Sequence, residues 1–392
     1  MAKCLIQELR QDKNKQIAEL AVTPILLNLT CSVFEDEKGK LPTKRADLYK
    51  KGLKDLLEKW DVTRGIQREQ PYGKLTTVEK EKLLARGAFD LFEREEYFPP
   101  QRRLVALIAE HLEMKESEEA EGILKSIESQ HGLLVERSEE YYSFSHLTFQ
   151  EYFTAYKIVH LSPPQLLEDA LKVLSGHITE KHWREVFLLA LEMLNSADGL
   201  LQAMKAEVNN IVAADEKLQT FLISAKEKFE LVDAPYKPAA IRAFYLDLEL
   251  ELDPDRARSN TSARARALNR ALNRALNLGS KTNSKLEDSI NSLREQLPNI
   301  DINDATFARW WMSEGAAWAE AMRQMMIRHR NIGHNWQFSD EQKEKLKQYY
   351  EANRFLVRCL NMKNIKVSDS VREEIENTLL LPTQKKEESK SQ

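Results

Sequence analysis

Residues 76 to 162 carry three helical patterns, then two short strand patterns, then another helical pattern, and this order constrains the fold more than any other feature. The first three lie around EKLLARGAFDLFERE, RRLVALIAEHL and SEEAEGILKSIESQ, where apolar residues recur at helical spacing. GLLVERSEEYYSFSH then predicts two strands, Leu133 to Glu136 and Tyr141 to Ser145, about a polar turn. Three helices followed by a hairpin is the order of a winged helix. We therefore predict a winged-helix domain at residues 76–162, with the hairpin as its wing.

The stretch YSFSHLTFQEYFTAYK, Tyr142 to Lys157, gathers six aromatic rings around one histidine. We expect Phe144, Phe149 and Phe153 to lie in the core. His146 stands where the strand pattern gives way to the helical one, and the residues leave two interpretations open. It is either a half-buried histidine that bonds a neighbouring carbonyl, or a phosphate contact beside the backbone amides of a helix N-terminus.

The predicted helix TFQEYFTAYKIVHL begins with a possible N-terminal capping pattern. Thr148 is followed three residues later by Glu151, the spacing of a capping box that satisfies the first backbone N–H groups. We therefore interpret Glu151 as the cap and Tyr152 as a core residue.

The remaining segments also carry helical patterns, so the predicted fold class is mainly α, with the small hairpin as its β-structure. Pro24 suits a first helical turn, and the apolar residues after it recur at helical spacing. Residues 266 to 277 repeat R-A-L-N three times, which predicts an amphipathic helix with a narrow leucine seam. The predicted divisions are a helical subdomain at 1–62, the winged helix at 76–162, a second helical subdomain at 163–232, a C-terminal helical domain at 235–381 and a disordered tail at 382–392.

Composition excludes several classes of protein. The formal net charge of -4 gives no general attraction to nucleic acid or anionic membrane. The cysteines Cys4, Cys31 and Cys359 lie far apart and form no CxxC pair, which favours reduced thiols in a cytosolic protein. The N-terminal stretch is charged and lacks a signal-peptide core, and no apolar stretch is long enough to span a bilayer. We expect a cytoplasmic protein without membrane contact.

Motifs for nucleotide hydrolysis and metal binding are missing from the sequence. Phosphate loops need glycine-rich turns followed by Lys and Ser or Thr, but Gly39-Lys40 and Gly73-Lys74 are each followed by Leu. GxGxxG, HExxH and GxSxG do not occur either. The histidine pairs His177/His182 and His329/His334 are spaced by five, which does not place both on one helical face. We therefore predict no catalytic residue, no enzyme activity and no metal site.

Nucleic-acid binding is disfavoured although a winged helix and a row of arginines are present. The third predicted helix, which enters the major groove in DNA-binding winged helices, reads ESEEAEGILKSIES and would be repelled by phosphates. An acidic run precedes the arginines and can pair with them. The arginines are Arg256, Arg258, Arg264, Arg266, Arg270 and Arg274.

Several stretches resemble one known family, the NACHT signal-transduction NTPases, which include the animal inflammasome receptors and many bacterial defence proteins. FSHLTFQEYFTA resembles the winged-helix signature of that family. ELAVTPILLNLTC and LPTKRADLYKKGLKDLLEKWD resemble the helical subdomain after the nucleotide-binding core, and HWREVFLLALEML resembles the next one. PYKPAAIRAFY, RNIGHNWQFS and LKQYYEANRFLVRCLN resemble a helical C-terminal domain common in cyanobacterial NACHT proteins.

This resemblance implies a nucleotide-contact site. In the family, the winged-helix histidine contacts the β-phosphate of ADP in the closed state, and by motif position that role falls on His146. The family's proline near the adenine corresponds to Pro24. The core with its phosphate loop is expected to be missing upstream of Met1, so ADP or ATP is expected as a cofactor only when a NACHT core completes the site.

The resemblance also implies a function and a partner. The chain is expected to be the regulatory, lid and sensor half of a NACHT NTPase in bacterial signalling or phage defence. Its partner would be a NACHT nucleotide-binding core or a full-length relative. Two alternatives stay open: a helical protein-interaction scaffold with no nucleotide role, and a nucleic-acid binder through the arginine row.

Overall fold

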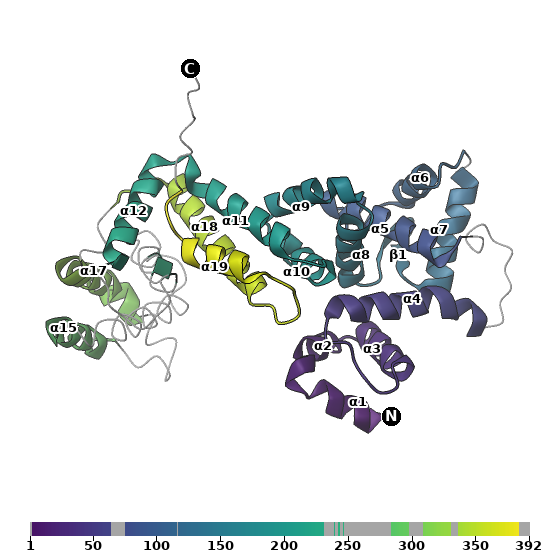
Figure 1. Ribbon diagram of the computed structural model, residues 1–392, viewed down its shortest axis with the longest axis horizontal. Helices are drawn as coiled ribbons and strands as arrows, with labels where there is room; N and C mark the ends of the chain where they lie inside the picture. Colours follow the sequence, from purple (N-terminus) through teal and green to yellow (C-terminus); the bar gives the residue numbers. More distant parts are fainter. Residues whose placement is uncertain are drawn as a thin grey trace, which may run out of the picture. The chain divides into compact units, whose positions relative to one another are not determined.

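The computed structural model describes residues 2–63, 75–115, 117–230, 239, 242, 243, 246, 284–297, 309–330 and 336–383. These residues are mostly helical and contain one two-stranded antiparallel hairpin, which confirms the predicted fold class (Figure 1). The chain divides into two compact units. The first unit is Met1–Met204 with Arg358–Ser368, and the second is Lys205–Val357 with Asp369–Gln392.

The first unit contains helices up to α10 and both strands. Its helices are α1 (Ala2–Leu9), α2 (Lys15–Leu20), α3 (Pro24–Asp36), α4 (Arg45–Thr63), α5 (Thr77–Glu93), α6 (Gln101–His111), α7 (Ser117–His131), α8 (Leu147–His160), α9 (Leu167–Gly176) and α10 (Arg184–Met193). Its strands are β1 (Leu134–Ser138) and β2 (Tyr141–Phe144). The short 3₁₀ turns Asp12–Asn14, Pro164–Leu166 and Lys181–Trp183 precede α2, α9 and α10.

Helix α3 begins at Pro24, in the first-turn position that the sequence predicts, and packs on α4. The contact depends on Gly52 of α4. A Cβ atom placed there would overlap the side chain of Leu29 on α3, with its two methyl carbons at 2.7 and 2.8 Å. The absence of a side chain at Gly52 therefore sets how closely the two helices approach.

The predicted winged helix is present. Helices α5, α6 and α7 precede a hairpin in which Leu134 pairs with Phe144 and Glu136 with Tyr142. A short segment before α6 lines the other edge of β2, where Tyr142 N–H donates to the Pro99 carbonyl at 3.0 Å. The order of elements is therefore the one that the sequence pattern predicts.

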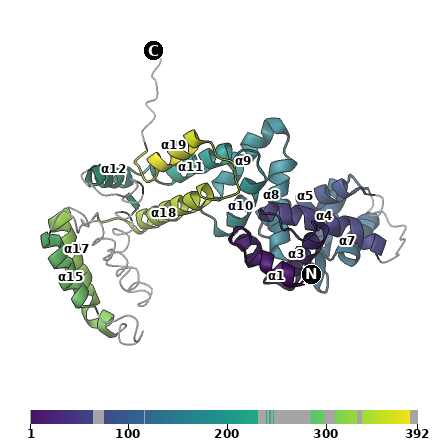
Figure 2. The ribbon, with the colours of Figure 1, turned by 60° about the horizontal axis from the view of Figure 1, so that its bottom comes forward.

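Helix α8 is the central element of the first unit. It packs along α5 and α10, and these three helices lie side by side in both views (Figure 1 and Figure 2). Phe149 and Phe153 are each 1% exposed, and Tyr49 of α4 meets the Phe149 ring edge-on at 6.3 Å. The prediction that the aromatic residues of this stretch form core is confirmed for Phe144, Phe149, Tyr152 and Phe153.

The second unit is also helical. Its elements are most of α11 (Asp198–Ala213), α12 (Glu216–Glu230), α15 (Ser284–Glu295), the π-helical turn Trp311–Gly315, α17 (Ala316–Arg330), most of α18 (Asp340–Leu360) and α19 (Asp369–Thr378). Trp318 is 3% exposed and donates its indole N–H to the Leu293 carbonyl, so it is a packing residue of this unit. Trp336 stacks on Phe338.

The C-terminal end of α19 is held by two buried cations. Lys205 Nζ donates to the Thr378 carbonyl at 3.0 Å, and Arg242 Nε donates to the Leu379 carbonyl at 2.6 Å. Cations suit this end of a helix, where carbonyl groups lack partners within the helix. Burial lowers the pKa of Lys205 to about 8.

Two of the predicted segments lie outside the described residues: the R-A-L-N repeat with the arginine row, and the tail from residue 384 onward.

Candidate functional site

His146 is the N-cap residue of α8. Its backbone is extended, with φ −142° and ψ 138°, and its ring accepts a hydrogen bond from the backbone N–H of Thr148. The ring nitrogen Nδ1 lies 3.2 Å from Thr148 N and 2.8 Å from Thr148 Oγ1. The side chain is half-buried, and burial lowers its pKa. His146 therefore combines a structural capping role with a position at a helix N-terminus.

The other ring nitrogen of His146 is not engaged by the cap. Within the described part of the chain, Nε2 has no hydrogen-bond partner, and neither has the backbone N–H of Leu147, which follows it. The hydroxyl of Ser145 is buried and also lacks a hydrogen bond. These hydrogen-bonding groups therefore lie next to one another at the N-terminus of α8. This is the positive end of the helix dipole, where anions are favoured.

Pro24 lies on a different surface element. It is exposed at the start of α3, among the exposed apolar side chains of Val22, Ile25 and Leu27. The hydroxyl of Thr23, which precedes it, is buried and makes no hydrogen bond. Among the described residues, no hydrogen bond or ring contact joins Pro24 to His146.

The predicted capping box of α8 is wrong. His146 Nδ1 occupies the capping position, Thr148 lies inside the helix, and Glu151 is 9% exposed rather than at the surface. The pKa of Glu151 is raised to about 8, mainly by burial and also by the Glu185 carboxylate, while Arg45 opposes the shift. Glu151 is therefore a buried carboxyl group that faces α4 and α10.

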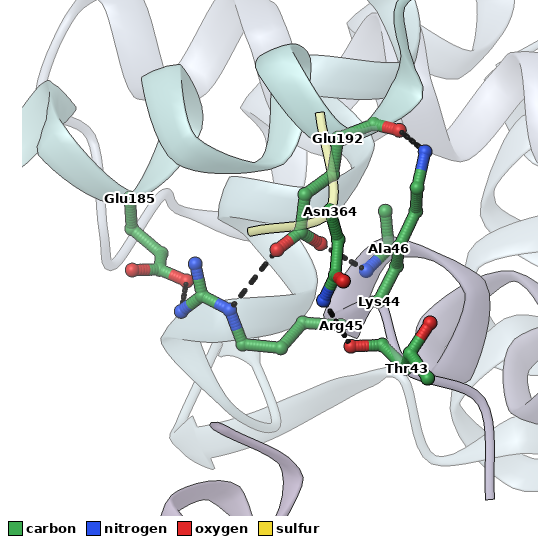
Figure 3. A network of polar contacts seen from close by, with 7 residues as sticks. All are labelled: Thr43, Lys44, Arg45, Ala46, Glu185, Glu192 and Asn364. Carbon is green, nitrogen blue, oxygen red and sulfur yellow. Dashed lines mark hydrogen bonds and ion pairs between the residues drawn. The ribbon is translucent and has the colours of Figure 1, made fainter. Parts of the chain in front are cut away.

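Arg45, at the start of α4, lies among these carboxylates. Its guanidinium pairs with Glu185, and its Nε lies 3.7 Å from Glu192 Oε1 on α10 (Figure 3). The Glu192 side chain is completely buried, and burial raises its pKa. Glu185 and Glu192 thus contact one guanidinium, which also lowers the pKa of Glu151, while burial raises the pKa of both Glu151 and Glu192.

The first turn of α4 is fixed by the same network. Glu192 Oε2 accepts from the Ala46 N–H, Lys44 Nζ donates to the Glu192 carbonyl at 2.8 Å, and Asn364 donates to the Thr43 carbonyl (Figure 3). The sequence patterns did not single out these residues. The available signal was Glu192 itself, a carboxylate inside the otherwise apolar run VFLLALEML.

The histidines of the first pair, His177 and His182, both contact Glu180. His177 Nδ1 contacts Glu180 at 2.9 Å, and its ring stacks on Trp183 with centroids 4.1 Å apart. His182 lies 3.6 Å from the same glutamate. His334 lies outside the described residues, and those that are described contain no group of three His, Cys, Asp or Glu side chains able to hold a metal ion.

The third helix of the winged helix presents acidic groups to solvent. Glu118 and Glu119 of α7 are exposed, and Glu121 pairs with Lys125 at 2.7 Å. None of the described helices is long and apolar enough to cross a bilayer.

Comparison with known families gives two matches. The family described as winged helix-turn-helix domain C-terminal to NACHT matches residues 45–158, so this match begins with α4. The family described as NACHT C-terminal helical domain 2 matches residues 286–382. Together they span more than half of the chain. No curated protein and no solved structure matches.

Proposed function

Because the chain belongs to the NACHT family and carries the domains that follow the nucleotide-binding core, we propose that it is the lid of a NACHT NTPase and closes over a bound nucleoside diphosphate. The observation that carries the proposal is His146. Its Nδ1 is engaged by Thr148, while Nε2 has no hydrogen-bond partner in the described part of the chain and stands at a helix N-terminus.

The groups around His146 suit a phosphate. The Leu147 N–H adds a donor beside the ring, and the α8 dipole favours a negative charge. On α3, Pro24 with its apolar neighbours would lie against the base. In this assignment the chain orients and retains ADP, while hydrolysis depends on a phosphate loop and a magnesium-binding acid supplied by a NACHT core.

The partner and setting belong to the same proposal. The lid would act on a NACHT nucleotide-binding core, in the same polypeptide or in a relative, and in the cytoplasm. The C-terminal helices would sense a ligand and release the closed state. The resemblance to bacterial NACHT proteins supports a role in signalling or defence against phage. By itself the chain should not hydrolyse ATP.

The test measures ADP release from a NACHT nucleotide-binding core mixed with this chain. The wild-type chain should slow the release of a fluorescent ADP, and His146→Ala should restore release by about fivefold, the effect of one hydrogen bond. His160→Ala is the matched control, because His160 is an exposed histidine at the opposite end of α8.

A different result would favour the scaffold alternative. If the chain binds the core but ADP release is the same with wild type, His146→Ala and His160→Ala, the lid proposal is wrong. The chain would then be a helical interaction protein whose histidine serves only as a helix cap.

A further inference from the structure

Two polar atoms of Thr148 lie close to one nitrogen of His146. Thr148 N lies 3.2 Å from Nδ1 and Thr148 Oγ1 lies 2.8 Å from it. A backbone N–H can only donate, so its bond to Nδ1 requires a lone pair on that nitrogen. The hydroxyl can donate or accept, and beside a lone pair it donates. Both contacts are satisfied together only when Nδ1 carries no proton.

We propose that Thr148 is a positioning residue that holds His146 as the neutral tautomer with its proton on Nε2, so that His146 meets its anionic ligand as a neutral hydrogen-bond donor rather than as a cation. The identity of that ligand as a nucleoside diphosphate rests on the proposed function; the tautomer does not. In this arrangement Nδ1 caps α8, and Nε2 of the same ring contacts the ligand.

The surroundings also oppose a charged ring. An imidazolium would have protons on both nitrogens, so the Thr148 N–H would lose its acceptor at the start of α8. It would also stand at the positive end of the helix dipole, where cations are disfavoured. The Phe149 ring lies 6.3 Å from the imidazole and contributes to its burial.

The charged groups nearby influence the pKa of Tyr49 rather than that of His146. Arg45 of α4, Glu185 of α10 and Glu151 of α8 influence the hydroxyl of Tyr49, which faces Thr148. Among the described residues none of them contributes to the lowered pKa of His146, whose cause is burial. The protonation of His146 is therefore governed by the cap and by burial, with no carboxylate to stabilise the cation.

The consequence for binding is specific. A cationic histidine would bind phosphate more tightly as pH falls from 8 to 6. A neutral donor held by Thr148 would give an affinity that does not rise over this range, because protonation breaks the cap. Glutamine, whose amide is a neutral donor of similar reach, should replace His146 better than lysine does.

The experiment uses the purified chain with ¹⁵N-labelled histidine and detects the two ring nitrogens of His146 by long-range ¹H–¹⁵N NMR. The His146→Gln spectrum assigns the signals by their loss. The expected wild-type spectrum has an unprotonated Nδ1 and a protonated Nε2. Thr148→Ser should keep this pattern, because both donors remain. Thr148→Val should lower the tautomer ratio by about fivefold, because one hydrogen bond to Nδ1 is lost.

Two results would overturn the proposal: a wild-type His146 protonated on Nδ1, or a tautomer ratio that Thr148→Val leaves unchanged. A parallel measurement of ADP release with the NACHT core separates the two claims. Loss of the ADP effect with the expected tautomer intact would disprove the lid function alone. An ADP effect that strengthens at low pH would disprove the neutral donor alone.

Discussion

The carboxylate of Glu192, at the end of α10, accepts a hydrogen bond from the backbone N–H of Ala46, in the first turn of α4, at 2.9 Å. Lys44, just before α4, donates in return to the Glu192 carbonyl at 2.8 Å. Each helix end therefore supplies the partner that the other lacks: a carboxylate for free N–H groups and an ammonium for a free carbonyl. This reciprocal capping joins segments that are 146 residues apart in sequence.

Replacing Arg45 by Met should destabilise the protein, because Glu192 would lose the nearest guanidinium while it stays buried. We expect the free energy of unfolding to fall by about 3 kcal/mol, which is at the low end of the cost of removing one partner from a buried ion pair. The cost stays low because the raised pKa of Glu192 limits the charge that is left unpaired. Urea unfolding gives the free energy of unfolding. The double variant Arg45→Met/Glu192→Gln should recover part of the loss, and equal stability of the two variants would refute the assignment.

Glu151 should make stability depend on pH between about 4.5 and 8. Its pKa is raised from 4.5 to about 8, so the folded state holds a proton that the unfolded state releases. The stabilisation is present below the unfolded pKa and is lost as pH rises through the folded one, by up to about 1.4 kcal/mol per pH unit.

Glu151→Gln should flatten this slope, because the amide imitates the protonated carboxyl group at every pH. Thermal unfolding at pH 6 and pH 8.5 measures the effect, with the exposed Glu118→Gln as the matched control. A slope that survives in Glu151→Gln would show that the titrating group lies elsewhere.

Two glycine substitutions should have opposite effects. Gly87 lies inside α5 beside an apolar pocket, and a Cβ atom there meets nothing within 4 Å. Gly87→Ala should therefore stabilise the protein by about 0.5–1 kcal/mol, the helix-propensity difference. Gly52→Ala should destabilise it by about 1–3 kcal/mol, because the methyl group overlaps Leu29. Chemical denaturation of both variants checks the signs; a stabilising Gly52→Ala would contradict the described packing of α3 on α4.

The three cysteines should differ strongly in reactivity. Cys4 is exposed and Cys31 is partly exposed, while burial raises the pKa of Cys359 to about 12. Because the thiolate is the reactive form, a disulfide reagent at neutral pH should modify Cys4 and Cys31 while Cys359 reacts only on unfolding. Thiol titration of native and denatured protein, with Cys4→Ser as a reference, measures this order. Rapid native reaction of Cys359 would show that its helix opens.

The sequence predicted those parts of the fold that depend on local patterns. Strand alternation and helical spacing located the wing and α8, and Pro24 located the start of α3. The pattern at Thr148 and Glu151 was misleading, because a spacing of three residues occurs both in a capping box and between residues on one buried face of a helix. Tertiary packing decided between them: α4 and α10 bury Glu151, and the His146 ring takes the cap.

The cluster around Arg45 could not be predicted in the same way. Its members, Arg45, Glu151, Glu185 and Glu192, lie on three helices, and a single sequence carries no record of which helices meet. Glu192 alone was conspicuous, as a carboxylate in an apolar run. The position of His146 between strand and helix was predicted. Which ring nitrogen accepts the Thr148 N–H depends on the local geometry of the helix start, and sequence spacing does not give it.

Both rims of the wing carry contacts that oppose the addition of another strand. On the β2 side, the neighbouring segment contains Pro99 and Pro100, which have no N–H to offer to an incoming strand. On the β1 side, the outward N–H of Glu136 is already bonded to Glu128 of α7 at 2.9 Å. Unpaired strand edges are templates for aggregation, and these contacts on both rims work against that. We therefore expect any self-association of this domain to use helix surfaces and side chains rather than the wing.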